Sequence, residues 1–518
     1  MNAEYAFFAC ARELERFPNF HLQMIQSSPV HAGAPQGLVL AVDIGTSSLR
    51  IALFHAEGTR IIASTSQQTY PLKVTPDGGA ELSPKDLLSA AEKALEETLA
   101  YFRSDPALAH LSIQSVGGSC FWHSFLGLDA KGRAVTPILT WADSRCREDA
   151  ARLRVKFSEK DIHARTGCML RASFWPARLR WLKRTQPDLF AKVSYWISPG
   201  DWLWQQWTGK KSLSISMASG TGLFNPHRLQ WDAKLLKHCG LRKTLLGDPS
   251  DEAIPARRCR FLELRAAKFY SPLGDGAASN LGSGAAQPNL AAINFGTSGA
   301  VRVILEKLAR PVPQGLFCYR VDAQRYLVGG AISNAGNLRA WCLRELKLEE
   351  DPGALEKALA ALVKKPQPMT ILPFWVSERS PTWCEEIPGT IFGLTQSTTA
   401  LDLLLACTEA TYQRLAQVID LLPLSKPAQA RFIVSGGIQK SSEAVRRLAD
   451  VLGRPLLPSV EQEASLRGAA VFVLEKLGYR VTGARVNQVV SPRAEAARMY
   501  RLARRRQTDL EKLLSKKT

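Results

Sequence analysis

The chain has 518 residues, of which 46% are hydrophobic and 22% are charged, a composition typical of soluble globular proteins. This length is too great for a single hydrophobic core, so we expect at least two domains. The 67 Lys and Arg exceed the 47 Asp and Glu, giving a net charge of +20. The basic residues are scattered and no nucleic-acid-binding signature accompanies them, which favours a solvated basic surface over a DNA or RNA site. A positive field would also suit anionic substrates.

Cysteine usage and hydropathy predict a cytoplasmic protein without a membrane segment. The ten cysteines are widely spaced and include no C-x-x-C pair, which argues against a zinc ribbon and for reduced thiols. No apolar run approaches the roughly 20 residues that span a bilayer. The N-terminus lacks the basic region of a signal peptide, so we expect residues 1–36 to form a flexible leader, with Met24 as an alternative start.

The first strong motif covers residues 38–54, LVLAVDIGTSSLRIALF. Two apolar runs flank a small polar turn, a pattern that predicts strand, tight turn and strand. Asp43 ends the first run, and Gly45, Thr46 and Ser47 open the turn. A carboxylate above a turn rich in hydroxyls and backbone donors suits a phosphate group with its Mg²⁺. The alternative is an ordinary β-hairpin with a polar turn.

Periodicity places further elements along the chain. Strands are expected near residues 61–71, 113–118 and 125–128. Apolar spacing predicts helices at 82–102, 145–157, 178–190, 201–209, 400–421, 441–452 and 463–477, and a solvated basic helix from residue 494 onward. The tryptophans at 202, 204 and 207 are interpreted as core residues. Residues 214–222 are small and polar and are expected to form a turn-rich loop.

Two segments carry side chains suited to binding a sugar. Trp122 and His123 follow the buried strand that ends near Gly118, and ligand sites in open α/β sheets lie at such strand ends. If residues 138–145 form a strand, Asp143 and Arg145 share one face with Trp141, because strand side chains alternate. That set would suit a sugar, and equally a surface ion pair beside a core tryptophan.

Asp275 is the candidate general base. It lies between two glycines in the sequence LGDGAAS, an exposed and approachable position before a run of small residues. Phosphoryl transfer to an alcohol uses a carboxylate that accepts the hydroxyl proton as the oxygen attacks. The alternative is an acid that caps a helix or stabilises a turn.

The motif at residues 38–54 has a partial repeat at 290–304, LAAINFGTSGAVRVI. Gly296 and Thr297 occupy the second turn, and Asn294 stands where the acid was. Two such turns indicate two similarly built halves that hold one phosphate chain between them. The segment 431–441 reads as strand, Gly-Gly turn and helix, which is either a nucleotide contact or a packing turn. Since the chain contains neither a P-loop nor a G-x-G-x-x-G motif, any nucleotide binds by another scheme.

Taken in order, these motifs resemble those of the FGGY carbohydrate kinases over about residues 38–490. The motifs are DIGTS, TWADSR, SMASGTGLF, GDGAA, NFGTSGA, GGAISNAGN, ERSPTW and VSGGIQKS. Within the family the likeness is greatest to FGGY-type gluconate kinases, through the stretches WHSFL, PILTWADSR, FGTSGAVR, GGAISNAG and SERSPTW. Glycerol and xylulose kinases share the framework but match these stretches less well.

The resemblance implies an α/β fold of two actin-like (ribonuclease H-like) domains with a cleft between them. It divides the chain into a leader at 1–36, a sugar-binding domain at 37–283 that carries the base, a nucleotide-binding domain at 284–490 and a basic helical tail at 491–518. The implied activity is ATP-dependent phosphorylation of a sugar or sugar acid, above all D-gluconate to 6-phosphogluconate. The implied ligands are ATP, Mg²⁺ and the sugar, and the expected assembly is a homodimer, without nucleic acid or membrane.

The same resemblance implies roles for individual residues. Asp43 would hold the magnesium and phosphate group, and Asp275 would be the catalytic base. The nucleotide and its phosphates would lie against Gly45, Thr46, Ser47, Gly296, Thr297, Gly336, Gly437 and Ser441. The sugar would contact Trp122, His123, Asp143 and Arg145.

Three positions depart from the family pattern, and none of them touches the base or the phosphate turns. Ser214 replaces the usual aspartate, Arg178 the usual lysine, and Glu409-Ala410 the usual Glu-Gly pair. A substrate carboxylate would need a partner, for which Arg145, Arg171, Arg178 and His123 are the candidates. Kinases for xylulose, ribulose, glycerol or erythritol, and a non-catalytic actin-like sensor of sugar or ATP, are the alternative functions.

Overall fold

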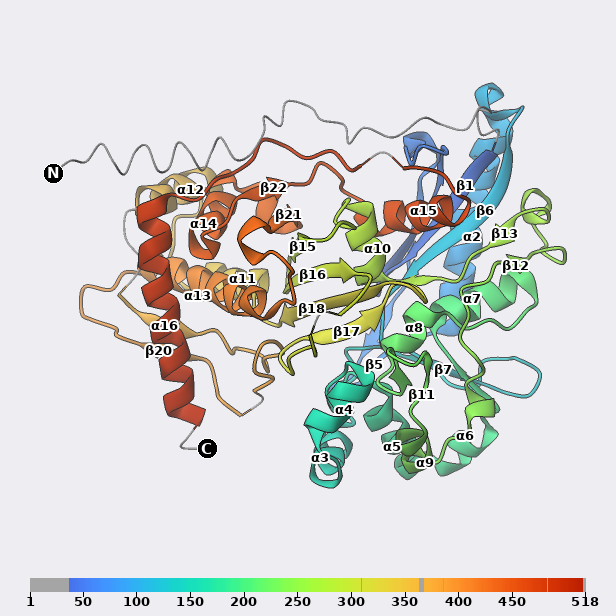
Figure 1. Ribbon diagram of the computed structural model, residues 1–518, viewed down its shortest axis with the longest axis horizontal. Helices are drawn as coiled ribbons and strands as arrows, with labels where there is room; N and C mark the ends of the chain where they lie inside the picture. Colours follow the sequence, from blue (N-terminus) through green and yellow to red (C-terminus); the bar gives the residue numbers. More distant parts are fainter. Residues whose placement is uncertain (1–36, 309, 363–367, 385, 482, 516–518) are drawn as a thin grey trace.

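The computed structural model describes residues 37–308, 310–362, 368–384, 386–481 and 483–515. The expected leader at residues 1–36 lies outside this range. Two mixed β-sheets, each with helices packed around it, form the two halves of the molecule (Figure 1). This architecture confirms the predicted pair of actin-like α/β domains.

The first sheet is built around β1, whose apolar residues are buried on both faces, as expected of a central strand. β1 pairs antiparallel with β2 and parallel with β6. In order, the sheet contains β12 (Ile254–Pro255), β13 (Lys268–Phe269), β6 (Ser112–Cys120), β1 (Gly37–Ile44), β2 (Ser48–Phe54) and β3 (Ser66–Thr69), with β14 (Leu273–Gly274) against the end of β6.

The second sheet repeats this plan, which confirms the predicted internal similarity. β15 pairs antiparallel with β16 and parallel with β21, as β1 does with β2 and β6. The order is β17 (Phe317–Arg320), β18 (Tyr326–Ile332), β16 (Gly299–Leu305), β15 (Leu290–Phe295), β21 (Arg431–Ser435) and β22 (Leu456–Pro458). Smaller sheets pair β4 (Leu72–Val74), β5 (Ala80–Leu82) and β8 (Ile138–Leu139); β7 (Leu126–Leu128) and β9 (Tyr195–Ile197); β10 (Phe224–Asn225) and β11 (Gln230–Trp231); and β19 (Thr370–Leu372) and β20 (Thr390–Phe392).

Most helices agree with their sequence signals. Ser83 caps α2 by accepting a hydrogen bond from the Asp86 N–H, as its position predicted. The helices up to the second sheet are α2 (Pro84–Ser104), α3 (Arg147–Lys156), α4 (Glu159–Thr166), α5 (Trp175–Thr185), α6 (Pro187–Lys192), α7 (Pro199–Thr208), α8 (Ile215–Ser219), α9 (Ala233–Cys239) and α10 (Asp275–Gly282). The later ones are α11 (Gly336–Glu345), α12 (Pro352–Ala361), α13 (Ala400–Leu421), α14 (Ser442–Leu452), α15 (Ala464–Lys476) and α16 (Ala494–Ser515).

Two local expectations were wrong, and the conditional strand at 138–145 is absent. The single helix expected at 178–190 is divided into α5 and α6 at Gln186. Residues 214–222 are not merely a loop, because Ser214 caps the short helix α8 by accepting from the Met217 N–H. Residues 138–145 do not form one strand, since β8 ends at Leu139 and a turn follows. Trp141, Asp143 and Arg145 therefore do not share a strand face.

The core of the first half draws on a helix from far along the chain. α15 packs against β1, β6 and α10, and its apolar residues from Leu466 to Leu474 belong to the same hydrophobic cluster as β1. A Cβ on Gly468 would lie 1.7 Å from the Ala278 carbonyl oxygen, so glycine is needed where α15 crosses α10. Residues 37–283 thus do not complete the first core by themselves.

The basic tail is also packed rather than fully solvated. Gln507 and Glu511 of α16 are buried, and Gln507 donates to the carbonyls of Ile371 and Ala410. Glu511 accepts hydrogen bonds from Arg414 of α13 at 2.6 Å and from Thr382 at 2.7 Å. α16 therefore fixes the loop that follows β19.

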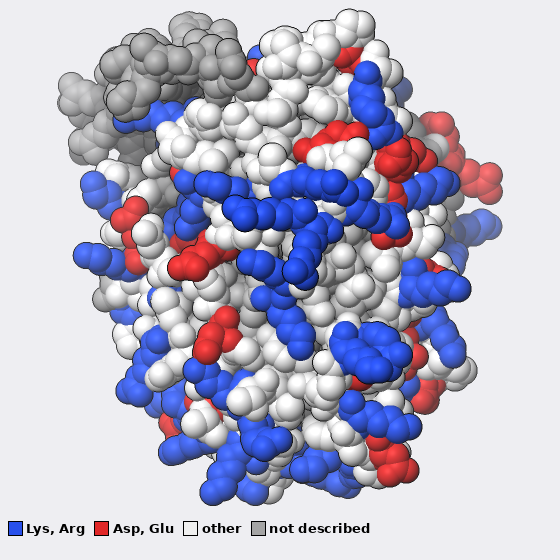
Figure 2. All heavy atoms as spheres, turned by 90° about the vertical axis from the view of Figure 1, so that its right-hand side faces the viewer, with Lys and Arg blue, Asp and Glu red and all other residues white. Residues whose placement is uncertain are grey.

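Surface charge matches the basic composition. Figure 2 shows one face of the molecule on which Lys and Arg side chains outnumber acidic ones, with the two kinds intermixed. None of the described helices is both long and apolar enough to cross a membrane.

Candidate active site

The two polar turns predicted to hold phosphate occupy equivalent places in the two sheets. Gly45 N–H donates to the Ser48 carbonyl at 2.9 Å in the turn between β1 and β2. Gly296 N–H donates to the Ser298 carbonyl at 3.0 Å between β15 and β16. Ser47 and Thr297 are exposed at these turns, so their polar groups are accessible to a ligand.

The residue before each turn has an equivalent partner on the neighbouring parallel strand. Asp43 pairs with Ser119 of β6, whose buried hydroxyl lowers the pKa of the carboxylate. Asn294 stands beside Ser435 of β21, and its amide donates to the serine hydroxyl at 3.4 Å. Each half thus places a serine beside the residue that precedes the turn. That residue is an acid in the first half and a neutral amide in the second.

Asp275 is the first residue of α10 and its side chain is exposed, as the sequence predicted. Its Oδ1 accepts a hydrogen bond from the Gly276 N–H at 2.8 Å. The glycine before Asp275 leaves space for the Trp122 side chain, because a Cβ on Gly274 would lie 1.8 Å from the indole ring. The G-D-G sequence therefore lets the indole pack beneath the acid.

The two acids influence each other electrostatically. Burial, opposed by the Ser119 hydroxyl and reinforced by the negative charge of Asp275, raises the pKa of Asp43 to about 6. Loss of solvent around the carboxylate also raises the pKa of Asp275, while the Arg302 guanidinium opposes this rise. Two carboxylates with raised pKa values favour the binding of a cation or a proton near them. A raised pKa also suits a carboxylate to act as a base.

Mg²⁺ would have Asp43 as its protein ligand. Among the described residues no three His, Cys, Asp or Glu side chains converge as a complete metal site. Mg²⁺ commonly uses one or two carboxylates with waters and substrate phosphates, so a single acid at a phosphate turn fits it. The mutual repulsion of Asp43 and Asp275 agrees with that fit, because a divalent cation would relieve it.

Trp122 and His123 lie against the same group of residues. The Trp122 indole donates to the Ser216 carbonyl at 3.0 Å, and its ring contacts that of Tyr319. His123 Nδ1 lies 2.6 Å from the Gly220 carbonyl oxygen, so this nitrogen carries the proton and Nε2 is left as an acceptor. Burial lowers the pKa of His123 to about 3, so the ring is neutral and can accept from a hydroxyl but cannot pair with a carboxylate.

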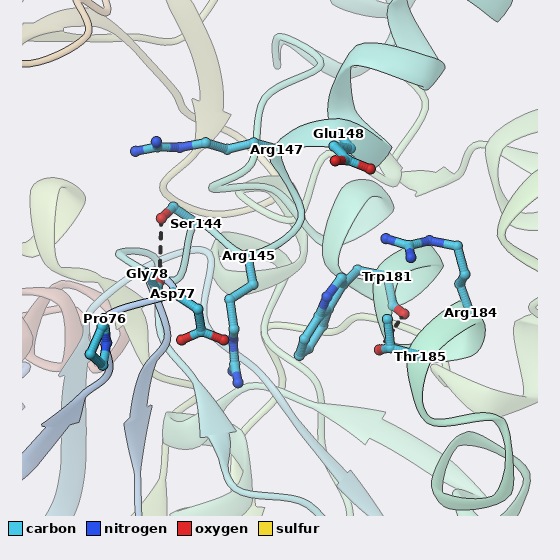
Figure 3. Close-up of a pocket in the computed structure, with 10 residues that line it drawn as sticks. All are labelled: Pro76, Asp77, Gly78, Ser144, Arg145, Arg147, Glu148, Trp181, Arg184 and Thr185. Carbon is cyan, nitrogen blue, oxygen red and sulfur yellow. Dashed lines mark hydrogen bonds between the residues drawn. The ribbon is translucent and has the colours of Figure 1, made fainter.

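Asp143 and Arg145 form an ion pair at another place. The Asp143 carboxylate is buried and bonds to the Ala80 N–H, and Arg145 bonds to it and to Glu81. The Arg145 guanidinium stacks on Trp181 and lines a hollow of about 610 Å³ that Figure 3 shows. In the described part of the chain, no hydrogen bond, ion pair or ring contact joins this pair to Asp275, Trp122 or His123.

The residues proposed for the nucleotide lie on the second half. Gly336 begins α11, and its N–H donates to the Gly296 carbonyl at 2.9 Å, which ties that helix to the second turn. Gly437 is exposed, with nothing near its missing side chain, whereas Gly436 adopts a positive φ against Phe295 and serves packing. Ser441 caps α14, and its hydroxyl donates to Glu356 at 2.7 Å.

Sequence reasoning missed two arginines at the site, Arg302 of β16 near Asp275 and Arg379 of the loop after β19 near His123. Arg302 opposes the pKa rise of Asp275, and Arg379 affects the pKa of His123. Both stand in stretches that carry the likeness to gluconate kinases, FGTSGAVR and SERSPTW. Their convergence depends on tertiary structure, and no local sequence signal reports it.

Comparison with protein families decides the class. The model of the FGGY carbohydrate kinase N-terminal domain matches residues 38–250, and that of the C-terminal domain matches residues 291–474. The chain belongs to the FGGY family of carbohydrate kinases. As a member of that family it is a carbohydrate kinase.

Several characterised kinases are similar to this FGGY kinase. Gluconokinase of Bacillus subtilis is 25% identical over 458 residues, which cover 85% of this chain and 88% of that protein. Glycerol kinase of Nitrobacter hamburgensis is 27% identical over 464 residues, 83% of this chain and 88% of the relative. The crystal structure of gluconate kinase from Lactobacillus acidophilus superimposes with a TM-score of 0.84 at 23% identity, covering 92% of this chain and 98% of that one.

Proposed function

We propose that this FGGY kinase transfers the terminal phosphoryl group of ATP to the 6-hydroxyl of D-gluconate. The observation that carries the proposal is the placement of Asp275 beside the first of two equivalent turns. The similarity to gluconokinase, Arg302 near Asp275 and Arg379 near His123 support an acidic sugar as acceptor. The product would be 6-phosphogluconate and ADP.

Each residue would have one task in this reaction. Asp275 would accept the hydroxyl proton while the sugar oxygen attacks phosphorus, a role that its raised pKa favours. The turns at Gly45, Thr46, Ser47, Gly296 and Thr297 would donate hydrogen bonds to the phosphates and stabilise the charge on the transferred group. When bound at Asp43, Mg²⁺ would neutralise phosphate charge.

The sugar and the nucleotide would occupy opposite halves. We assign the sugar to Trp122 and to the free Nε2 of His123, since these lie beside the base. Asp143 and Arg145 would act on the sugar side only if their pair with Glu81 opened, because their charges already compensate each other. The adenine nucleotide would lie against Gly336, Gly437 and Ser441.

Replacing Asp275 with Asn tests the role of the base. The amide keeps the size of the side chain but cannot accept the proton, so turnover with gluconate should fall at least about 100-fold. Calorimetry should show almost unchanged ATP binding, because Asp275 contacts the sugar hydroxyl rather than the nucleotide. Near-normal turnover in Asp275→Asn would remove this residue from the mechanism.

A substrate panel tests the acceptor. ADP release is measured with gluconate, xylulose, ribulose, glycerol and erythritol at matched concentrations, and gluconate should give the highest kcat/KM. A preference for a neutral sugar would replace gluconate as the substrate. ATP binding without turnover on any member of the panel would instead favour the non-catalytic sensor.

A further inference from the structure

Arg302 and Arg379 are two neighbouring cations without an ion-pair partner among the described residues, although Asp275 and Glu378 lend them some negative charge. In the part of the chain that the structure describes, neither forms an ion pair, and the buried Nε of Arg302 has no hydrogen-bond partner. Burial lowers the pKa of both arginines, and the positive charge of Arg302 lowers that of Arg379 further. Like charges held together away from water are costly, and proteins retain them mainly where an anion binds.

The neighbouring protein groups fix Arg379 in place but do not neutralise it. Its Nε donates to the Ser333 hydroxyl at 3.2 Å, and its second guanidinium nitrogen donates to the Ile332 carbonyl at 3.1 Å. Glu378 lends negative charge, but its Oε1 accepts from the backbone N–H groups of Ser333 and Arg379. Two neutral acceptors thus hold the Nε and one terminal nitrogen of the Arg379 guanidinium. The other terminal nitrogen can donate to a ligand.

The pair belongs to the second half of the molecule, and Arg302 reaches the base of the first half. A Cβ on Gly276, next to the base, would lie 2.7 Å from the Arg302 Nε. Arg302 acts on the pKa of both Asp275 and Arg379, whereas Arg379 acts on that of His123. Tyr319, whose ring packs on Trp122 and His123, is close to both arginines. Arg302 is therefore the arginine next to the base, and Arg379 is held at the end of β18 by Ile332 and Ser333.

We propose that Arg302 and Arg379 receive the carboxylate of the sugar acid, with Arg379 as the residue that selects an acid over a neutral sugar. This inference rests on the proposed gluconate kinase function. A linear acid bound with one end at Asp275 would extend along Arg302 and place its carboxylate at Arg379. Arginine can meet a carboxylate with two parallel hydrogen bonds, which suits it to this selection.

The other cations near the site are already engaged. Arg178 is fully buried, and its guanidinium donates to four backbone carbonyls, at Leu139, Thr140, His123 and Ser173. Arg145 pairs with Asp143 and Glu81, and Arg171 pairs with Glu159. His123 is neutral. None of these four candidates is therefore available to bind the substrate carboxylate, which leaves Arg302 and Arg379.

Arg379→Gln tests the proposal with two sugars that differ only at carbon 1. The KM for D-gluconate should rise about tenfold to a hundredfold, the range expected for one charged hydrogen-bonded contact. The inhibition constant of D-glucitol, which has a hydroxyl in place of the carboxylate, and the KM for ATP should stay within about twofold. Arg379→Lys keeps the charge and should recover part of the gluconate affinity.

Arg171→Gln is the matched comparison, because Arg171 contacts the same loop through the Trp383 carbonyl but has Glu159 as a partner. A selective rise of the gluconate KM in this variant, and not in Arg379→Gln, would overturn the inference. So would equal weakening of gluconate and glucitol in Arg379→Gln, or a raised KM for ATP alone. In those cases gluconate turnover by the wild type would still support the proposed function, whereas wild-type turnover of neutral sugars alone would overturn both.

Discussion

At the scale of single residues, the site depends on two acids that differ in their surroundings. Asp43 ends a buried strand beside Ser119, whereas Asp275 begins a helix with its side chain exposed. Protein atoms that displace water from around each carboxylate raise the pKa of both, and the positive charge of Arg302 limits the rise for Asp275. The balance between solvent loss and that arginine sets the pH at which the proposed base is ionised.

Arg302→Met should therefore shift the pH dependence of activity. Removing the cation withdraws the influence that lowers the pKa of Asp275, so this pKa should rise and less of the carboxylate should be ionised at a given acidic pH. The acid limb of the kcat/KM profile for gluconate should move to higher pH. Arg302→Lys should leave the limb close to that of the wild type, and an unmoved limb in Arg302→Met would contradict this electrostatic role.

At the scale of elements, the position of Asp275 depends on the crossing of α10 and α15. The two helices meet at Gly468 and Gly282, where a Cβ on Gly282 would lie 1.8 Å from the Ala464 carbonyl oxygen. In addition, the Ser465 hydroxyl donates to the Asp275 carbonyl at 3.4 Å. Close contact between backbones therefore holds the helix that presents the proposed base.

Gly468→Ala should damage both stability and turnover. The new methyl group would collide with the backbone of α10, and overpacking of this kind costs about 1–3 kcal/mol. Thermal unfolding should occur several degrees lower, and kcat should fall more than the KM for ATP rises. Gly353→Ala adds the same methyl to the exposed start of α12 and should change the unfolding temperature by less than about one degree.

Sequence patterns predicted helices and strands well where apolar residues repeat at regular spacing and so bury one face of the element. The limits of α13 at Ala400 and Leu421 agree with the prediction, and so does the Ser83 cap of α2. The patterns failed where tertiary contacts decide. α8 is held by the Ser214 cap inside a polar run, and the basic α16 conceals a buried Glu511.

The candidate site was predictable to a similar extent. Asp275 and both turns were visible because glycines, hydroxyls and an acid adjoin in the sequence. Arg302 and Arg379 were not predictable as a pair. Their residue numbers differ by 77, and no local sequence pattern indicates that the two side chains are neighbours. The sequence also does not show that Arg145 pairs with Asp143 and Glu81. Asp143 and Arg145 were therefore interpreted as candidate sugar ligands.

At the scale of the whole molecule, α16 connects the end of the described chain to the site. Arg414 of α13 is fully buried and bonds to Glu511, which also binds Thr382 in the loop that carries Arg379. A buried ion pair contributes little when complete but is costly to break, because the remaining charge stays in the interior. The last helix thereby helps to hold the arginine that we propose selects the substrate.

Glu511→Gln should lower the free energy of unfolding by about 3 kcal/mol, because Arg414 would lose its buried counter-charge. Urea unfolding measures this change, and the KM for gluconate should rise as the loop loosens. Asp420→Asn is the control, since it breaks an exposed pair between the same two helices, Arg504 with Asp420 at 3.1 Å. That change should cost less than about 1 kcal/mol, and equal losses in the two variants would contradict the role of burial.

The return of α15 to the first sheet has a consequence for biosynthesis. Ser465 of α15 contacts Asp275 of α10 at a sequence separation of 190, so a ribosome completes the first sheet long before it makes the helix that covers it. The apolar face of β1 and β6 would stay uncovered during that interval, which lengthens the time when chaperones can bind the nascent chain. For the same reason, a fragment that stops after α10 should stay soluble only if a segment containing α15 is supplied in trans.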